Sequence, residues 1–289
     1  MQDQLIRATA MDGKVRAFAV RTTGIVEELG KRHAMSPTAM AALGRTVSAG
    51  LIMGAMLKGD EQLTIIVKGG GPIGQVVVDA NANGDVRGYV DNPQVDLPLN
   101  QVGKLDVSGA VGTEGFLNII KDLGLKEPYR GSIPLISGEL AEDFTYYFAK
   151  SEQTPSAVAL GVLVDVDYSV IAAGGFVIQL LPGLSDDDIS LIELQLSRIE
   201  PITTLLSQGM DLEDILHRIL PEVQVLGVMD VRFRCKCSRE RVEQTLISLG
   251  REELELMLQE DGQAEVSCHY CNEAYLFNRE NLEGLIQEL

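Results

Sequence analysis

The chain has 289 residues, of which 45% are apolar, so its length allows one sizeable domain with its own core plus a smaller domain. Its 24 basic and 42 acidic residues give a net charge of -18, which disfavours nucleic acid and membrane surfaces as partners because both are anionic. The N-terminus lacks a basic region followed by an apolar run, and no stretch reaches the roughly 18 uninterrupted apolar residues of a membrane helix. We therefore expect a soluble cytoplasmic protein that binds neither nucleic acid nor membrane.

The first part of the sequence mixes strand and helix signals. Apolar and β-branched runs predict strands at residues 5–9, 15–22, 63–68, 75–80, 86–90, 104–111, 157–166 and 169–178. Turn signals at Asp12-Gly13 and at residues 81–84 join two pairs of these strands. Ser36 and Pro37 predict the start of a helix, and further helices are predicted near residues 113–123 and 137–151. Because neighbouring strands occur in runs with separate helices, the pattern favours an α+β fold.

A glycine-rich segment at residues 69–74 matches the G-x-G-x-x-G pattern of dinucleotide-binding proteins. However, Pro72 and the strand-like run after it replace the helix that would bind a pyrophosphate. Gln75 and Val76 also occupy the positions where a P-loop requires Lys and Ser or Thr. We interpret the segment as a tight connection between strands. The chain also lacks the H-E-x-x-H and G-x-S-x-G patterns, so we expect no catalytic residues and no enzyme activity.

The composition changes near residues 181–183, where an acidic helical segment begins. Ser185 and the three aspartates after it form a capped helix start. Between residues 185 and 230, ten acidic residues and two arginines give a net charge of -8. Four apolar residues of the first helix share one face, namely Ile189, Ile192, Leu196 and Ile199. We therefore predict an N-terminal mixed strand and helix domain at residues 1–180, a helical linker at 181–230 and a small C-terminal domain at 231–289.

All four cysteines lie in this last segment, in the pairs Cys235-x-Cys237 and Cys268-x-x-Cys271. A domain below roughly 70 residues usually needs a metal or disulfides for stability. In a reducing compartment, clustered cysteines indicate metal binding or redox chemistry before a disulfide framework. Two such pairs complete a Cys₄ site with no open position, so we predict one Zn(II) ion per chain with a structural or regulatory role.

The first pair has a single spacer residue, where ordinary zinc ribbons have two or more. Its disulfide would close a small ring and should be comparatively easy to reduce. Five basic residues surround it, which are Arg232, Arg234, Lys236, Arg239 and Arg241. We expect them to offset the charge of a zinc–thiolate centre and to favour the reactive thiolate form. Tyr275 is expected to pack beneath the second pair, and His269 to face solvent. Spacing alone fits a permanent structural zinc site as well as a switch.

Around these cysteines the sequence resembles the heat-shock protein 33 family, the redox-regulated holdase chaperones of the bacterial cytosol. The matching stretches are residues 233–242, 249–254 and 265–271, with Tyr275 and Phe277. Residues 147–156 and 174–176 also resemble the family, and the likeness covers essentially the whole chain.

The resemblance implies an N-terminal α+β domain, a helical linker and a C-terminal zinc domain. It also implies that the reduced, zinc-bound form is inactive. Peroxide or hypochlorous acid, together with unfolding stress, would form the disulfides Cys235–Cys237 and Cys268–Cys271. Zinc release would then unfold the C-terminal domain and loosen the linker, and the protein, as a homodimer, would bind unfolding clients without ATP. We hypothesise that Ile189, Ile192, Leu196 and Ile199 contribute to client binding or its control.

Other interpretations stay open from the residues alone. A thiol–disulfide oxidoreductase would use Cys268 and Cys271, but such an enzyme needs the motif to open a helix, whereas strands are predicted on both sides. A zinc-ribbon module for nucleic acid is disfavoured by the net charge of -18. A constitutive binding module with a permanent zinc site would protect clients equally before and after oxidation.

Overall fold

The N-terminal hairpin forms as its turn residues predict. In the computed structural model, which describes residues 2–289, residues 11–13 adopt positive φ angles and reverse the chain. This turn joins β1 (Gln4–Ala10) to β2 (Val15–Arg21) in an antiparallel pair. Successive side chains of β1 point to opposite faces, so that Leu5 and Ile6 enter different core clusters. The hairpin is therefore buried on both faces.

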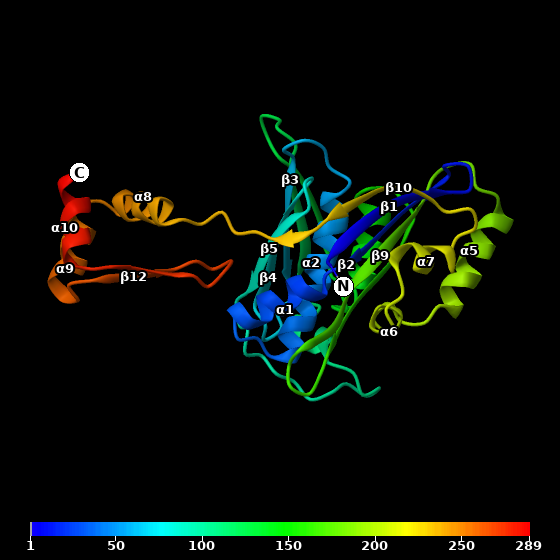
Figure 1. The fold of residues 1–289 in the computed structure, drawn as a ribbon, viewed down its shortest axis with the longest axis horizontal. Helices are drawn as coiled ribbons and strands as arrows, with labels where there is room; N and C mark the ends of the chain where they lie inside the picture. The colour runs from blue at the N-terminus through cyan, green and yellow to red at the C-terminus, as the bar shows by residue number, and fades with distance from the viewer. Residues whose placement is uncertain (1) are drawn as a thin grey trace. The chain divides into compact units, whose positions relative to one another are not determined.

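This hairpin belongs to a five-stranded antiparallel sheet with the order β10-β1-β2-β9-β8. The other strands are β8 (Ser156–Val164), β9 (Val170–Leu180) and β10 (Gln224–Asp230). β10 lies beside β1, with Gln4 opposite Asp230 (Figure 1). The sheet thus joins the start of the chain to the end of the segment expected to form the linker.

A second sheet has six strands in the order β11-β5-β4-β3-β6-β7. These strands are β3 (Gln62–Lys68), β4 (Gln75–Asn81), β5 (Asp85–Val90), β6 (Phe116–Asp122), β7 (Tyr129–Pro134) and β11 (Arg232–Phe233). All neighbours pair antiparallel except β11, which runs parallel to β5 at the sheet edge.

The glycine-rich segment connects β3 to β4, as predicted. A Cβ atom at Gly69 would lie 2.3 Å from the carbonyl oxygen of Gly112, and one at Gly71 would lie 2.3 Å from that of Ala110. The glycines therefore allow two backbone segments to pack in contact.

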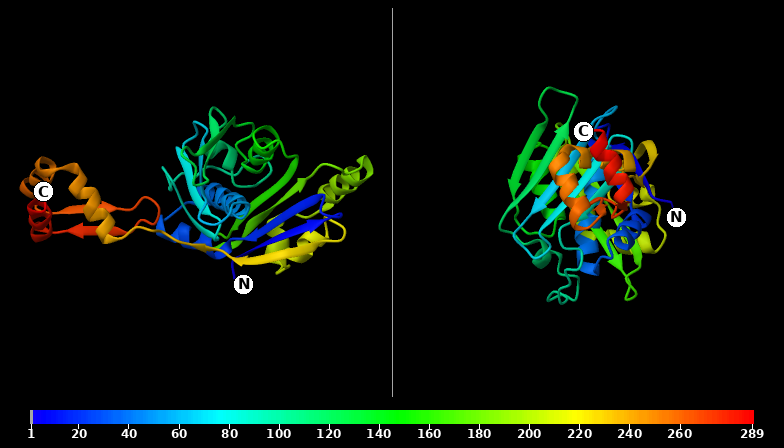
Figure 2. Two further views of the ribbon diagram at one scale, coloured as in Figure 1. Left: turned by 90° about the horizontal axis from the view of Figure 1, so that it is seen from above. Right: turned by 90° about the vertical axis from the view of Figure 1, so that its left-hand side faces the viewer.

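The buried helix α2 (Pro37–Gly54) contacts both sheets (Figures 1 and 2). It begins at the predicted proline after a capping serine, and all but two of its 18 residues are buried. A Cβ atom at Gly44 would lie 2.7 Å from Val162 of β8, and one at Gly50 would lie 3.0 Å from Val78 of β4. Small residues thus bring the helix close to each sheet.

Two predicted elements of this region are wrong. Residues 104–111, predicted as a strand, contain the helix α3 (Val107–Val111), because Asp106 caps the amide of Gly109 and starts a helical turn. Residues 113–123, predicted as a helix, form β6. There the alternating side chains of Leu117 and Ile119 are fully buried and β6 pairs along its length with β3, so tertiary packing overrides the local pattern. The other helices of this region are α1 (Thr23–Arg32) and α4 (Ala141–Lys150), and both contribute residues to the main core cluster.

Three short helices cover the second face of the five-stranded sheet. They are α5 (Asp186–Arg198), α6 (Ile202–Ser207) and α7 (Leu212–His217). The sheet offers them mostly small side chains, among them Ala8, Ala17, Ala19 and Ala172, and the helices fill this shallow surface with Ile and Leu. The predicted capping box at the start of α5 is present, since Ser185 and Asp188 bond to each other's backbone. The whole of Met1–Arg234 forms one compact unit, the N-terminal unit.

Cys235–Leu289 forms a second unit, the C-terminal unit. It contains α8 (Arg239–Leu249), α9 (Arg251–Glu260), β12 (Ala264–Ser267), β13 (Ala274–Phe277) and α10 (Arg279–Gln287). Five buried side chains form its core, which are Leu246, Leu254, Phe277, Leu282 and Leu285. The α+β fold class is confirmed, and no helix within residues 2–289 has the length and apolarity needed to span a bilayer.

Candidate metal centre

The first cysteine pair lies directly before α8. Ser238 follows Cys237 in extended conformation, and its hydroxyl accepts the backbone N–H of Arg241, so the helix starts one residue after the pair. Cys235 and Cys237 are both partly buried. The cap fixes where the extended segment ends and thereby places Cys237 beside the helix N-terminus.

The second pair forms the turn of the β12–β13 hairpin. The backbone N–H of Cys268 donates to the carbonyl of Glu273 at 2.9 Å, and that of Asn272 donates to the carbonyl of Cys268 at 2.8 Å. Asn272 adopts a left-handed conformation with φ of 56°, which its short polar side chain tolerates. The tight turn directs Cys268 and Cys271 to the same side, and Cys271 is buried. His269, between them, is exposed as predicted.

The four sulfur atoms converge, lying within 4.8 Å of one another. The Sγ atoms of Cys235 and Cys268 are 3.7 Å apart, and those of Cys237 and Cys271 are 3.2 Å apart. At a Zn–S distance of about 2.3 Å, tetrahedral ligands would lie about 3.8 Å from each other. All four cysteines are free thiols. The donor set and its spacing therefore fit one tetrahedral zinc ion.

Tyr275 adds a contact that sequence patterns do not identify. Its hydroxyl donates to Sγ of Cys237 at 3.2 Å from the strand β13. Tyr275, expected to pack beneath the second cysteine pair, thus has a polar role as well. A hydrogen bond to a ligand sulfur fixes the orientation of that sulfur and stabilises its negative charge.

The four thiols differ in acidity when they carry no metal. Burial opposes ionisation of Cys235, but hydrogen bonds from the backbone and thiol of Cys237 and from the other two thiols outweigh it and lower its pKa to about 7. Burial raises the pKa of Cys268 and that of Cys271. Since the groups interact, the cluster titrates as a unit and not as four separate thiols.

The basic residues near the first pair have partners of their own. Arg232 and Arg234 bond to the carboxylate of Asp85, at 2.7 and 3.3 Å. Arg239 pairs with Glu243 at 3.2 Å and covers the ring of Phe277. The expected screening of sulfur charge by the five basic residues stays a prediction, and the structure adds ion-pair partners for Arg232, Arg234 and Arg239.

The apolar face predicted for the first linker helix is present in part. Ile192 is buried, and Leu196 and Ile199 pack against the same core cluster as the sheet. Leu191 and Leu194, on the other side of α5, are 40% and 43% exposed. Ile189 is half-buried and is not among the residues that pack on this cluster, and Ile199 directly follows the last residue of α5. Three of the four predicted residues therefore share a buried side, and a part in client binding stays a proposal.

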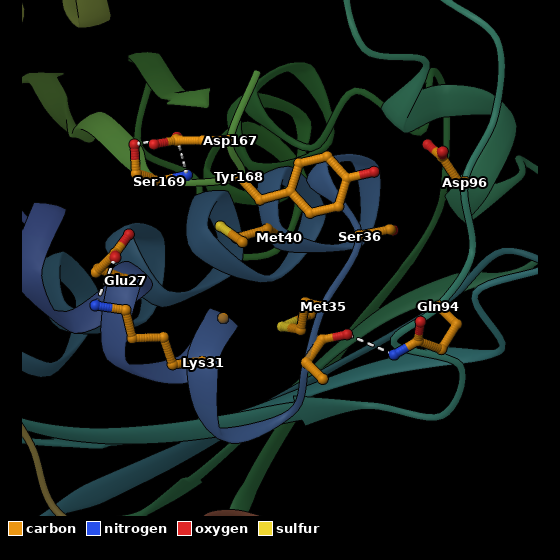
Figure 3. Close-up of a pocket in the computed structure, with 12 residues that line it drawn as sticks. Glu27, Lys31, Met35, Ser36, Met40, Gln94, Asp96, Asp167, Tyr168 and Ser169 are labelled. Atoms are coloured by element: carbon orange, nitrogen blue, oxygen red, sulfur yellow. Dashed lines mark hydrogen bonds and ion pairs between the residues drawn. The ribbon is translucent and has the colours of Figure 1, made fainter. Parts of the chain in front are cut away.

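A cavity of 640 Å³ in the N-terminal unit is distinct from the thiol cluster (Figure 3). It lies beside α1 and is lined by acidic, methionine and tyrosine side chains. Glu27 pairs there with Lys31 at 2.8 Å, and Asp167 accepts hydrogen bonds from the backbone and hydroxyl of Ser169. Because these carboxylates already have partners, we assign no ligand to the cavity.

Comparisons with known proteins cover the whole chain. A family model described as "Hsp33 protein" matches residues 3–278. The chain is 56% identical to the 33 kDa chaperonins of Bacillus cereus (strain AH187) and Bacillus anthracis (strain A0248), over 291 aligned residues that span 100% of both proteins in each comparison. It is also similar to the crystal structure of the 33 kDa chaperonin, a heat shock protein 33 homolog, from Thermotoga maritima. The TM-score is 0.93 at 41% identity, with 100% of this chain and 99% of the other covered.

Proposed function

Because this chain belongs to the Hsp33 family of chaperones, we propose that it is a redox-regulated, ATP-independent holdase that binds unfolding proteins under oxidative and heat stress. The reduced, zinc-bound form is inactive in this proposal. Oxidation of the cysteines, loss of zinc and unfolding of the C-terminal unit activate it. The observation that carries the proposal is the convergence of four free thiols within 4.8 Å.

The thiol cluster can link stability to redox state. When bound, Zn(II) would cross-link Cys235, Cys237, Cys268 and Cys271 and contribute on the order of 10 kcal/mol to folding. The core of the C-terminal unit contains only five buried side chains, so burial alone offers little to replace that contribution. Loss of the thiolate ligands is therefore expected to unfold this unit.

Oxidation removes the ligands in pairs. Each disulfide forms with the loss of two electrons and two protons from two thiols, and one peroxide molecule takes them up to give two waters. We propose the pairs Cys235–Cys237 and Cys268–Cys271. The sulfur contacts of 3.7 and 3.2 Å instead join one pair to the other, so geometry in the reduced form does not select a pairing. Peptide mapping of the oxidised protein would identify the bonds directly.

The helical linker supplies a surface for clients or for their control. Helices α5, α6 and α7 cover the sheet with apolar side chains, and α5 and α7 also carry exposed acidic residues. If these helices loosened, an apolar surface would be exposed beside negative charge. Such surface binds other proteins' exposed cores, and the charge keeps the complex soluble. We propose that Ile189, Ile192, Leu196 and Ile199 take part.

We further propose a cytoplasmic protein that forms a homodimer in its oxidised form. Free, clustered thiols suit a reducing compartment. Unfolded or partly folded proteins are the proposed partners, and the net charge of -18 makes nucleic acid and anionic membranes poor ones.

The central experiment follows zinc and chaperone activity together. The protein is treated with peroxide at elevated temperature, and zinc release and suppression of client aggregation are measured in parallel. We expect protection to appear as zinc leaves, and both to reverse after dithiothreitol and zinc are added. All four cysteines of the chain belong to the cluster, so thiol titration reports on this site alone. Retention of zinc through oxidation, or unchanged protection after its loss, would favour a permanent structural site.

The linker hypothesis needs a matched pair of variants. Ile192→Ser introduces a hydroxyl on the buried face of α5, whereas Leu191→Ser changes a neighbouring residue that is 40% exposed. We expect only Ile192→Ser to alter the holdase activity or its oxidation threshold. Equal activity in both variants would remove this face from the proposal.

The structure disfavours an oxidoreductase. In such enzymes the reactive cysteine gains acidity from a helix N-terminus, whereas Cys268 and Cys271 lie in a turn between two strands. The same oxidation assay, run with a disulfide substrate, would detect turnover if it occurred.

A further inference from the structure

The segment directly before the first metal-binding cysteine is docked on the N-terminal unit as an extended strap. In the strap, residues 229–234, side chains that pack inward alternate with exposed side chains. Met229, Val231 and Phe233 pack against the main core cluster, and Val231 is 5% exposed. The alternate residues Asp230, Arg232 and Arg234 are exposed, and the two arginines flank Phe233. An extended chain with this alternation is the form in which one peptide adds to the edge of a sheet.

A buried acid recognises the two arginines. The side chain of Asp85, at the start of β5, is 9% exposed. Its two oxygens accept from Nε of Arg232 at 2.7 Å and from Nη1 of Arg234 at 3.3 Å. Asn81 donates to the same carboxylate. One carboxylate therefore accepts hydrogen bonds from two arginines that are separated by a single residue.

Backbone hydrogen bonds also hold the strap at the edge of β5. Arg232 N–H donates to the carbonyl of Gly84 at 3.0 Å, and Arg234 N–H donates to that of Val86 at 2.9 Å. A Cβ atom at Gly84 would lie 2.6 Å from the carbonyl oxygen of Asp230. The absence of a side chain at this glycine therefore lets the strap approach the sheet edge.

The aromatic residue of the strap completes the fit. The guanidinium carbon of Arg32, on α1, lies 4.9 Å from the centre of the Phe233 ring. The groups that receive the strap are thus an anion for flanking basic residues, a cation over an aromatic ring, and backbone acceptors at a strand edge.

We propose that this edge of β5 is a docking site for an extended client segment with an aromatic residue between two basic residues, and that the strap occupies it in the reduced protein. The inference rests on the proposed chaperone function and names a partner class for it. The strap's own contacts define the occupant, because they show which side chains the edge accepts. Client and strap would compete for the same contacts.

The strap is suited to exchange. Its pairing with β5 spans only Arg232 and Phe233, and the side chains of Arg232 and Arg234 are 65% and 55% exposed. At the other end of the strap, Met229 and Asp230 belong to β10 and pair with β1. The chain runs from Arg234 straight into Cys235. Unfolding of the C-terminal unit removes an anchor at that point, so local opening of the strap becomes easier.

The test uses the full-length protein and a fluorescein-labelled peptide with the sequence of residues 229–234, Met-Asp-Val-Arg-Phe-Arg. Binding is measured by fluorescence anisotropy. We expect weak binding to the reduced, zinc-bound protein and at least tenfold tighter binding after oxidation and zinc removal. A peptide with both arginines replaced by glutamine should bind about tenfold more weakly, because two charge-assisted hydrogen bonds are lost.

Two variants of the same contact should have opposite effects. Arg232→Gln/Arg234→Gln weakens the strap and should raise peptide binding in the reduced protein. Asp85→Asn weakens the docking site and should lower peptide binding to the oxidised protein about tenfold. Asp79→Asn is the matched control, since Asp79 lies on the adjacent strand β4 and pairs with Arg87. Zinc content and thermal unfolding are recorded for each variant to establish that it is folded.

The proposal is overturned if Asp85→Asn binds the peptide as tightly as Asp79→Asn, or if the strap variant does not bind more peptide than the unaltered reduced protein. Peptide binding that follows these expectations without any suppression of aggregation would contradict the proposed function and leave the docking site standing. Suppression of aggregation without peptide binding would do the reverse.

Discussion

The two units of the chain are stabilised by different means. The N-terminal unit has two core clusters, which fill both faces of its five-stranded sheet and surround a helix buried on nearly all sides. The C-terminal unit has five buried side chains and four convergent thiols. The first unit relies on apolar burial and contains no cysteine. The second relies on groups that an oxidant can change.

This difference shows how an oxidant could change the structure of one unit of the chain and spare the other. We expect that breaking the thiol cluster would remove the main support of the C-terminal unit and leave the cores of the N-terminal unit intact. The strap and the linker helices belong to the N-terminal unit, yet the strap ends directly at Cys235. A change in the small unit can therefore reach the large one through the covalent chain without unfolding it.

Metal removal tests the comparison most strongly. With a zinc chelator under reducing conditions, we expect the C-terminal unit to unfold, because structural zinc contributes about 10 kcal/mol to such domains. Hydrogen exchange measured by mass spectrometry should show loss of protection across residues 235–289 and retained protection in the strands of the N-terminal unit. Uniform exchange in both units, or none in either, would contradict the division.

A pair of core substitutions should sharpen the comparison between the two units. Phe277 and Phe144 are both fully buried, one in each unit, and replacing either with alanine should cost about 3–5 kcal/mol. In the small unit this is a large share of the stability, so Phe277→Ala should unfold it and weaken zinc retention. Phe144→Ala should lower the melting temperature of the N-terminal unit while zinc stays bound. The readouts are calorimetry and zinc content, and similar zinc loss in both variants would refute the prediction.

The hydroxyl of Tyr275 should tune the metal centre. Tyr275→Phe removes the donor 3.2 Å from Sγ of Cys237 and leaves the ring in place. Loss of such a supporting contact weakens metal binding by about 10-fold or more. Competition with a chromogenic chelator measures the change, and Tyr129→Phe in the N-terminal unit is the control. Unchanged affinity would mean that the hydroxyl does not act on the bound form.

The smallest effect concerns the strap and pH. Burial works against ionisation of Asp85, but hydrogen bonds from Arg232 and Asn81 and the charges of Arg232 and Arg234 outweigh it and lower its pKa below the ordinary 3.8. A lowered pKa means that the stabilisation is complete above pH 3.8 and is lost as pH falls through the folded-state pKa. At pH 7, Asp85→Asn should cost on the order of 1 kcal/mol, since both guanidinium groups are half exposed. The melting temperatures of the variant and the unaltered protein should differ at pH 7 and converge toward pH 3. A difference that persists at low pH would assign the effect to packing and not to charge.

Local sequence signals predicted much of the molecule. The four thiols were identifiable from spacing, because each pair needs only a short segment to bring its sulfurs together. The hairpin turns, the start of α2 and the capping box at Ser185 were likewise predictable, since their causes lie within a few residues.

The remainder depends on partners distant in sequence. The strand β6 was mistaken for a helix, because its pairing with β3 is invisible in its own residues. Nothing in the sequence indicates that Asp85 accepts hydrogen bonds from two arginines that follow it by 147 and 149 positions. The hydroxyl contact of Tyr275 also requires β13 to meet the first cysteine pair. Long-range pairing decides all three.

The pairing of β10 with β1 also has a consequence for synthesis of the chain. One edge of the N-terminal hairpin is completed only by residues 224–230. At roughly 5–20 residues per second on the ribosome, β1 would wait on the order of ten to forty seconds for its neighbour. During that interval the nascent chain presents an apolar hairpin with an unpaired edge, which is the kind of surface that aggregates. A protein proposed to protect unfolded chains would therefore pass through such a state during its own translation, and slowing elongation before residue 224 should lower its soluble yield.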